Sequence, residues 1–178
     1  SCLDTIAEHR RSGDNVRLFV NQSARSVQDP ERIEWMRQAL ESRRIPAAQI
    51  SIDLRMEDAG KHLAGYMSFA LAMKQLGVSL TLSGVEGGDQ ATDMLMHLPV
   101  DFIKLSPRYT SDRGGDRRNE LRDLVNLAHA SGRRVIAPRV EEARVAASLW
   151  SSGIDLIQGN FVQQATRDAN YDFKVAHA

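Results

Sequence analysis

This sequence of 178 residues contains little cysteine, no excess of charge of either sign and no long apolar run. The single cysteine, Cys2, excludes an internal disulfide framework and favours a reducing compartment. Lysine and arginine together number 23, as do aspartate and glutamate, so the overall charge indicates neither nucleic-acid nor membrane binding. No apolar run reaches the roughly 18 residues of a membrane-spanning helix, and no signal peptide opens the sequence. We therefore expect a cytoplasmic protein.

The rest of the composition is typical of one globular domain. Hydrophobic residues make up 42% of the chain and charged residues 26%, and the length suffices for a buried core. Neither an internal repeat nor a low-complexity linker divides the sequence. We expect a single domain over residues 1–178, in which residues 166–178 form a loose tail.

Hydrophobic periodicity predicts strands that alternate with helices. The clearest strand holds Val78, Leu80 and Leu82, which alternate with small polar residues and run into a glycine-rich loop. Asp89 and Asn119 are placed to cap the helices that follow them. The predicted strands lie at 16–21, 50–54, 78–82, 102–105, 134–137 and 154–158. The predicted helices lie at 1–11, 30–42, 58–76, 89–98, 120–130 and 141–150.

Six strands with helices between them, at spacings of roughly 20 to 35 residues, predict an α/β fold with a parallel sheet. In such sheets the chemistry lies beyond the carboxyl ends of the strands. A complete eight-stranded barrel usually needs about 250 residues, so this chain is short of one by about two strands.

Polar residues at the predicted strand ends are the first candidates for a site. Asn21 ends one strand, and it either contacts a ligand or caps its own loop. Lys104 ends another, and it either contacts a phosphate or balances the charge of Asp53 or Glu141 across the sheet. A Schiff-base lysine is a further alternative, although no partner acid is evident. The sequence alone leaves these alternatives open.

Four segments carry a resemblance to a known family. They are 20–24 with Asp29-Pro30, 76–78, 98–104 and 157–159. In order and spacing they resemble the bacterial EAL domain, the family of cyclic di-GMP phosphodiesterases and their inactive relatives. The resemblance implies a TIM-barrel variant in which the ligand lies across the carboxyl ends of the strands. The strand with the Glu-Ala-Leu signature would precede Ser1, so we expect a barrel incomplete at the N-terminus, with about six parallel strands in this chain.

An active member of this family is expected to hold two divalent metals through carboxylates and one asparagine. Asn21 matches that asparagine, Asp53 replaces a glutamate, and Lys104 matches a lysine beside the attacking water. Glu141 and Gln158 keep the identities that the family has there. Because several expected carboxylates are replaced, the resemblance implies a non-catalytic domain with no metal cofactor. The replaced acidic positions carry Ser83, Gly84, Ser106 and Pro138.

Arginines beyond the strand ends offer another way to bind an anion. Arg55, Arg108 and Arg139 could bind phosphate directly through forked hydrogen bonds, or they are solvated loop side chains. Gln158 and Phe161 could hydrogen-bond and stack on a guanine base, or Phe161 packs at the barrel rim. The predicted ligand-binding residues are Asn21, Asp53, Lys104, Arg139, Glu141, Gln158 and Phe161.

From these residues we expect a non-catalytic EAL-type domain that acts as a cyclic di-GMP receptor or a protein-interaction module in bacterial second-messenger signalling. Two alternatives stay open: a residual metal-dependent phosphodiesterase, and a protein-binding scaffold that binds no nucleotide. A protein partner is expected, and a homodimer could form through the apolar face of the helix that holds Met67 and Met73. No nucleic-acid or membrane partner is expected.

Overall fold

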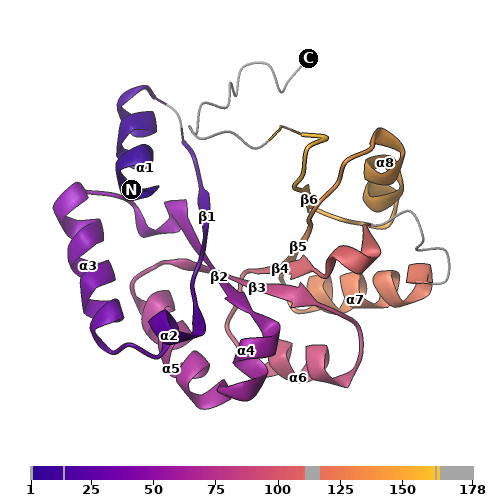
Figure 1. Ribbon diagram of the computed structural model, residues 1–178, viewed down its shortest axis with the longest axis horizontal. Coiled ribbons are helices and arrows are strands. Elements are labelled where there is room, and N and C mark those ends of the chain that lie inside the picture. The colour runs from indigo at the N-terminus through magenta and orange to yellow at the C-terminus, as the bar shows by residue number, and fades with distance from the viewer. Residues whose placement is uncertain (1, 14, 111–116, 163, 165–178) are drawn as a thin grey trace.

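The computed structural model describes residues 2–13, 15–110, 117–162 and 164. Within them, six parallel strands form one sheet whose order follows the chain, and the sheet curls into a half-barrel (Figure 1). The predicted α/β class and incomplete barrel are confirmed. The strands are β1 (Leu18–Asn21), β2 (Ile50–Arg55), β3 (Ser79–Val85), β4 (Phe102–Leu105), β5 (Arg134–Ala137) and β6 (Leu156–Ile157).

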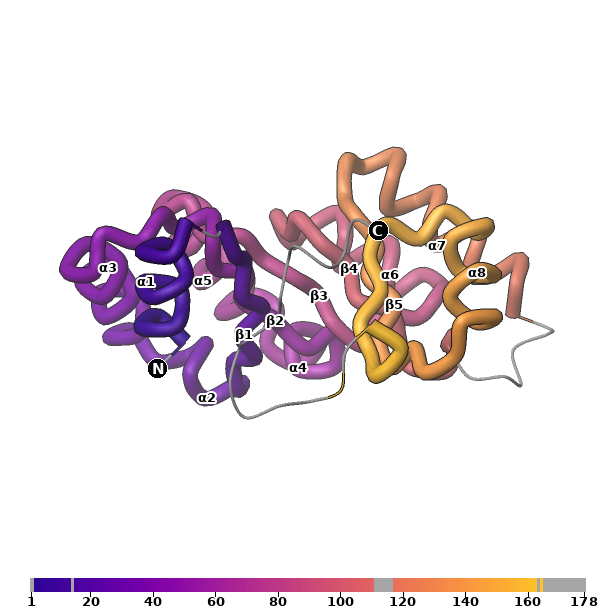
Figure 2. The backbone as a smooth tube through the Cα atoms, turned by 90° about the horizontal axis from the view of Figure 1, so that it is seen from above, coloured from indigo at the N-terminus to yellow at the C-terminus, as the bar shows by residue number. Residues whose placement is uncertain are grey.

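Helices connect the strands throughout the described part of the chain. Seen from above, the strands run in chain order from β1 to β5 across the middle of the view, with α1 and α3 on the left and α8 on the right (Figure 2). None of these helices is both long and apolar enough to cross a membrane. They are α1 (Cys2–Arg11), α2 (Ala24–Val27), α3 (Glu31–Arg43), η1 (Ala47–Gln49), α4 (Met56–Lys61), α5 (Leu63–Gln75), α6 (Asp89–His97), η2 (Pro107–Tyr109), α7 (Arg118–Ala130) and α8 (Ala143–Ser151).

The segment 58–76, predicted as one helix, is two helices, α4 and α5. His62 leaves the helical conformation between them, with φ −136° and ψ 42°. Both helices pack on β3, but α4 also contacts β2 and α6 whereas α5 also contacts α2 and α3. Periodicity along the chain cannot reveal such a break, because it reports only which residues face inward.

Neither Asp89 nor Asn119 caps its helix as predicted, although Asp29 contacts the start of α3. Asp29 accepts a hydrogen bond from the backbone N–H of Glu31 at the start of α3, at 3.0 Å. Gly88 occupies the N-cap position of α6, and Asp89 is the first residue of the helix. Gly88 has a φ of 115°, a backbone conformation that glycine adopts readily. Helix α7 begins at Arg118, so Asn119 lies inside its first turn.

The two outer strands are shorter than predicted. β1 was expected over 16–21 and β6 over 154–158, but each pairs with a neighbour on one side only and extends over fewer residues. The expected loose tail at 166–178 lies outside the described residues.

The core lies between the sheet and the helices. Leu54, Leu80 and Ile103, from three adjacent strands, are fully buried. Met73 of α5 is fully buried as well, and Met67 packs partly buried against the same core. These methionines therefore stabilise the domain itself, and the large apolar side chain that α5 exposes is Leu71.

The same aspartate contact recurs at the amino ends of two strands. Asp101, just before β4, accepts a hydrogen bond from the N–H of Leu80 at 2.8 Å and pairs with Lys74 at 2.6 Å. Asp155, just before β6, accepts one from the N–H of Val135 at 2.6 Å. Each carboxylate thus ties a strand to its neighbour at the end of the sheet opposite the strands' carboxyl ends.

Candidate functional site

The carboxyl ends of the strands surround a cavity of about 730 Å³. That volume lies within the range of small-molecule sites, roughly 300 to 1,000 Å³. The strand register produces this arrangement, because Asn21 is paired with Asp53 and Ser83 with Lys104 across adjacent strands. Segments following β5 and β6 complete the lining through Arg139 and other residues.

The structure brings six of the seven predicted ligand-binding residues together in this cavity. The exception is Phe161, which is not part of the lining and whose side chain is partly exposed. Its backbone N–H donates a hydrogen bond to the carbonyl of Val140 at 3.0 Å. The six that line the cavity are Asn21, Asp53, Lys104, Arg139, Glu141 and Gln158.

Lys104 pairs with Asp53 inside the cavity. Its Nζ atom lies 2.5 Å from Oδ2 of Asp53, and the side chains are 14% and 2% exposed. The other oxygen of this carboxylate, Oδ1, is buried and has no hydrogen-bond partner among the described residues. Nζ also lies 5.9 Å from the centre of the Phe19 ring. Of the roles considered for Lys104, the structure therefore shows charge balance with Asp53.

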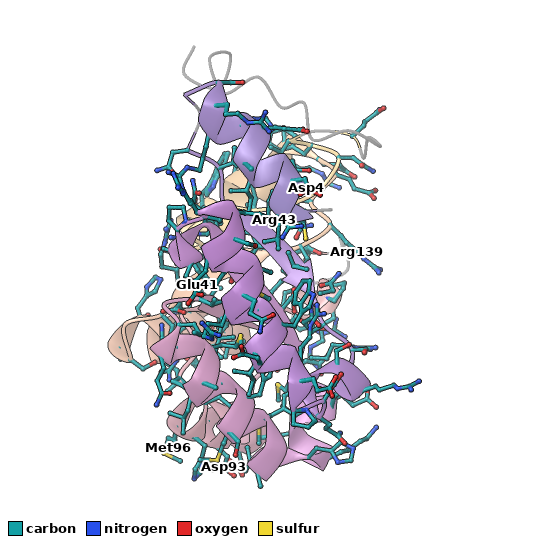
Figure 3. The ribbon with its side chains drawn as sticks, turned by 90° about the vertical axis from the view of Figure 1, so that its left-hand side faces the viewer. Asp4, Glu41, Arg43, Asp93, Met96 and Arg139 are labelled. Carbon is teal, nitrogen blue, oxygen red and sulfur yellow. The ribbon has the colours of Figure 1, made fainter. Side chains whose placement is uncertain are left out.

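Arg139 lies in a loop that is fastened to the chain after β6. The Gln158 N–H donates to the Ala137 carbonyl, and the Val140 N–H donates to the Gln158 carbonyl, both at 2.9 Å. Arg139 itself has φ +54°, a left-handed conformation that costs an L-residue roughly 1–2 kcal/mol. Its side chain is at the right-hand margin of the molecule in Figure 3.

Gly159 allows this close approach of the two loops. Its φ is +154°, and a Cβ atom built on it would lie 2.2 Å from the carbonyl oxygen and 2.4 Å from the nitrogen of Val140. No side chain fits in that space. The position of Arg139 at the cavity thus depends on Gly159, which the sequence analysis placed in a family segment without a role in positioning Arg139.

The other two arginines have different surroundings. Arg55 lines the cavity, and its exposed guanidinium is 4.0 Å from Glu57. Arg108 does not line it, which corrects the hypothesis that it reaches an anion there. Instead Arg108 pairs with Glu86 at 2.9 Å and with Glu120, and it also donates to the Tyr109 hydroxyl.

The residues present do not fit the two-metal site that the resemblance implies. The cavity lining includes two carboxylates, Asp53 and Glu141, and the first is already paired with Lys104. Across the described ranges, no three His, Cys, Asp or Glu side chains are grouped so that they could hold a metal ion. Two divalent cations need several anionic oxygens to neutralise them.

Some lining residues were missed from the sequence. Gln22 follows Asn21 directly and Asn160 follows Gly159, so each lay within two residues of a strand end that had been recognised. With Asn21 and Gln158 they supply four amide side chains, which can both donate and accept hydrogen bonds. Proximity to a strand end was the signal that would have found them.

Comparison with known proteins agrees with this architecture. The EAL domain family matches residues 1–165. The chain belongs to this family. It is 28% identical over 156 residues to the cyclic di-GMP phosphodiesterase PdeR of Escherichia coli K12, a match that covers 86% of this chain and 24% of that protein.

Two solved EAL domains are similar in structure to this one. The FimX EAL domain of Xanthomonas citri, in complex with cyclic di-GMP, superposes with a TM-score of 0.91 at 25% identity, covering 97% of this chain and 69% of that one. The FimX EAL domain of Pseudomonas aeruginosa, also bound to cyclic di-GMP, gives 0.88 at 28% identity with the same coverage. The chain spans about a quarter of the length of the curated relatives it matches.

Proposed function

We propose that this EAL domain binds cyclic di-GMP without hydrolysing it and acts as a receptor or interaction module in second-messenger signalling. The proposal concerns the cavity at the carboxyl ends of the strands. Its two parts, binding and the absence of catalysis, have separate support and separate tests.

The charge balance of the cavity is the observation that carries the proposal. Two carboxylates face three cations, Arg55, Lys104 and Arg139, and one carboxylate is buried against Lys104. A site of this kind repels divalent cations and attracts anions. Cyclic di-GMP carries two phosphodiester anions and two guanine bases, which match the guanidinium and amide groups of the lining.

The relatives support binding more directly than catalysis. The two FimX EAL domains described above, from Xanthomonas citri and Pseudomonas aeruginosa, were solved with cyclic di-GMP bound. The similarity to PdeR, a phosphodiesterase, favours a second candidate function, metal-dependent hydrolysis of the same nucleotide. The ligand is shared by both candidates, so hydrolysis is what separates them.

The decisive experiment combines calorimetric titration with a hydrolysis assay on the intact protein. We expect cyclic di-GMP to bind, and the nucleotide to be recovered uncleaved after incubation with Mg²⁺ or Mn²⁺. PdeR in the same buffers is the positive control for cleavage. Metal-dependent turnover would establish the phosphodiesterase, whereas no binding heat at any metal concentration would favour a scaffold that binds no nucleotide.

A receptor also needs a way to pass on its signal, and we propose that a protein partner or a second copy of this chain receives it. The helices carry exposed apolar side chains at Trp35, Leu71, Met96 and Trp150. Sedimentation of the protein with and without cyclic di-GMP tests the homodimer. A nucleotide-dependent change in mass supports it, and a constant monomer contradicts it.

A further inference from the structure

Two residues other than glycine have a positive φ in the described part of the chain, Arg44 and Arg139. Arg44 has an evident structural reason. It follows the last residue of α3, where a left-handed residue lets the backbone N–H groups of Arg44 and Ile45 bond the carbonyls of Glu41 and Leu40. Arg139 follows a strand and not a helix, so helix-capping hydrogen bonds do not offset the cost of its left-handed conformation.

The side chain of Arg139 is also uncommitted. In the described chain its guanidinium takes part in no hydrogen bond or ion pair, although it lines the cavity. The other two cations of the lining have carboxylates beside them: Lys104 lies on Asp53, and Arg55 lies 4.0 Å from Glu57. Arg139 is therefore the cation most available to an anionic ligand. Backbone strain held at a cavity is typical of functional sites.

We propose that Arg139 is the phosphate anchor of this cavity and that Gly159 is its positioning residue. This inference rests on the proposed function, because the anion is taken to be a phosphodiester of cyclic di-GMP. The planar guanidinium binds two phosphate oxygens through parallel hydrogen bonds. It takes over the charge neutralisation that metal ions would provide, so binding is independent of divalent cations.

The loop contacts explain how the anchor is held. Val140 donates to the carbonyl of Gln158 and accepts from the N–H of Phe161, so the residue after Arg139 is fixed on both sides. Gly159 lies against the backbone of Val140, closer than any Cβ could come. A side chain at Gly159 would push this loop away and displace the guanidinium from the cavity.

Titration of cyclic di-GMP into Arg139→Gly tests the anchor. Glycine adopts φ +54° without strain, so the variant should fold at least as stably as the wild type. We expect its Kd to rise about tenfold to a hundredfold, the effect of losing a charge-assisted hydrogen bond. Arg139→Lys keeps the positive charge but loses the paired hydrogen bonds of the guanidinium. Its Kd should lie between those of the wild type and Arg139→Gly.

Arg44→Gly is the matched control, because it removes the other left-handed arginine, which does not line the cavity. Its Kd should equal that of the wild type. If the wild type binds cyclic di-GMP and the Kd of Arg139→Gly is within twofold of the wild-type value, Arg139 is not the phosphate anchor, but the proposed nucleotide binding is supported. If the wild type itself gives no heat, the proposed function fails. A requirement for Mg²⁺, seen as loss of binding in EDTA, would overturn the metal-independent anchor.

A double-mutant cycle tests the positioning role of Gly159. Gly159→Ala should weaken binding in the wild type but cause no further loss in Arg139→Gly, since the group that it positions is already gone. A purely structural role predicts the same loss in both backgrounds. That result would remove Gly159 from the proposal and leave the Arg139→Gly titration as the test of the anchor.

Discussion

Lys104 and Asp53 meet inside the half-barrel although their strands are not neighbours. β3 lies between β2 and β4, and the lysine reaches across it to place Nζ 2.5 Å from Oδ2 of Asp53. Both side chains are largely withdrawn from solvent. An ammonium group thus stands beside the carboxylate that would otherwise be the most buried anionic ligand of the cavity.

Removing the lysine should leave an uncompensated buried charge. Lys104→Met is expected to lower the free energy of unfolding by about 3–5 kcal/mol, as measured by urea denaturation. Asp53→Asn in the same chain should recover much of the loss. Lys61→Met is the control, because Lys61 and Glu57 form a pair of similar length, 2.6 Å, with both side chains exposed, and this pair should contribute little. Equal losses in the two lysine variants would contradict this prediction.

Asp155 should contribute to a loss of stability in acid. Burial alone raises the pKa of its carboxyl, but hydrogen bonds from the Val135 N–H and from His129, 2.9 Å away, lower the pKa below the usual value. A lowered pKa in the folded state means that the stabilisation is present above about pH 4 and is lost as the pH falls further. Asp155→Asn should therefore be less stable than the wild type at pH 7.

The difference in free energy of unfolding between the wild type and Asp155→Asn should become smaller as the pH falls below about 4. Denaturation curves at a series of pH values from neutral to acid measure it. A difference that stays constant over the whole series would show that protonation of Asp155 does not contribute.

Gly159→Ala should be more damaging than alanine at another glycine of positive φ. Gly132, with φ +73° at the end of α7, has no atom within 4 Å of a Cβ built on it. Gly132→Ala therefore pays only the conformational cost, about 1 kcal/mol, whereas Gly159→Ala also forces the Val140 backbone to move. Thermal unfolding of the two variants compares them, and a larger shift for Gly132→Ala would show that the loop relaxes freely.

Two buried tyrosines should respond in opposite ways to loss of the hydroxyl. The Tyr109 hydroxyl accepts from the N–H of Gly87 at 2.9 Å and donates to Glu120 at 2.7 Å, so Tyr109→Phe should cost about 1–3 kcal/mol. The Tyr66 hydroxyl is buried, and no group in the described part of the chain forms a hydrogen bond with it. Tyr66→Phe should be neutral or stabilising. Urea denaturation measures both variants, and a larger loss of stability in Tyr66→Phe than in Tyr109→Phe would contradict the prediction.

The sequence predicted best what depends on neighbours along the chain. Short apolar runs, some of them alternating with polar residues, located the six strands, because a strand buried against helices shows its pattern over a few residues. The parallel arrangement then required the strand ends to meet, which is why Asn21, Asp53, Lys104 and Gln158 line one cavity. The boundaries were less accurate: the predicted helix 58–76 is interrupted at His62, and the two outer strands are shorter than predicted.

The sequence by itself thus determined the alternation of elements, the family and the edge of the sheet where polar side chains gather. Only the tertiary structure decided which charges meet there. Lys104 pairs with Asp53, Arg108 turns to Glu86 and Glu120, and Arg139 alone of the three stays without a carboxylate partner among the described residues. These choices depend on distances between residues that lie far apart in the sequence, and ionic contacts change steeply with such distances.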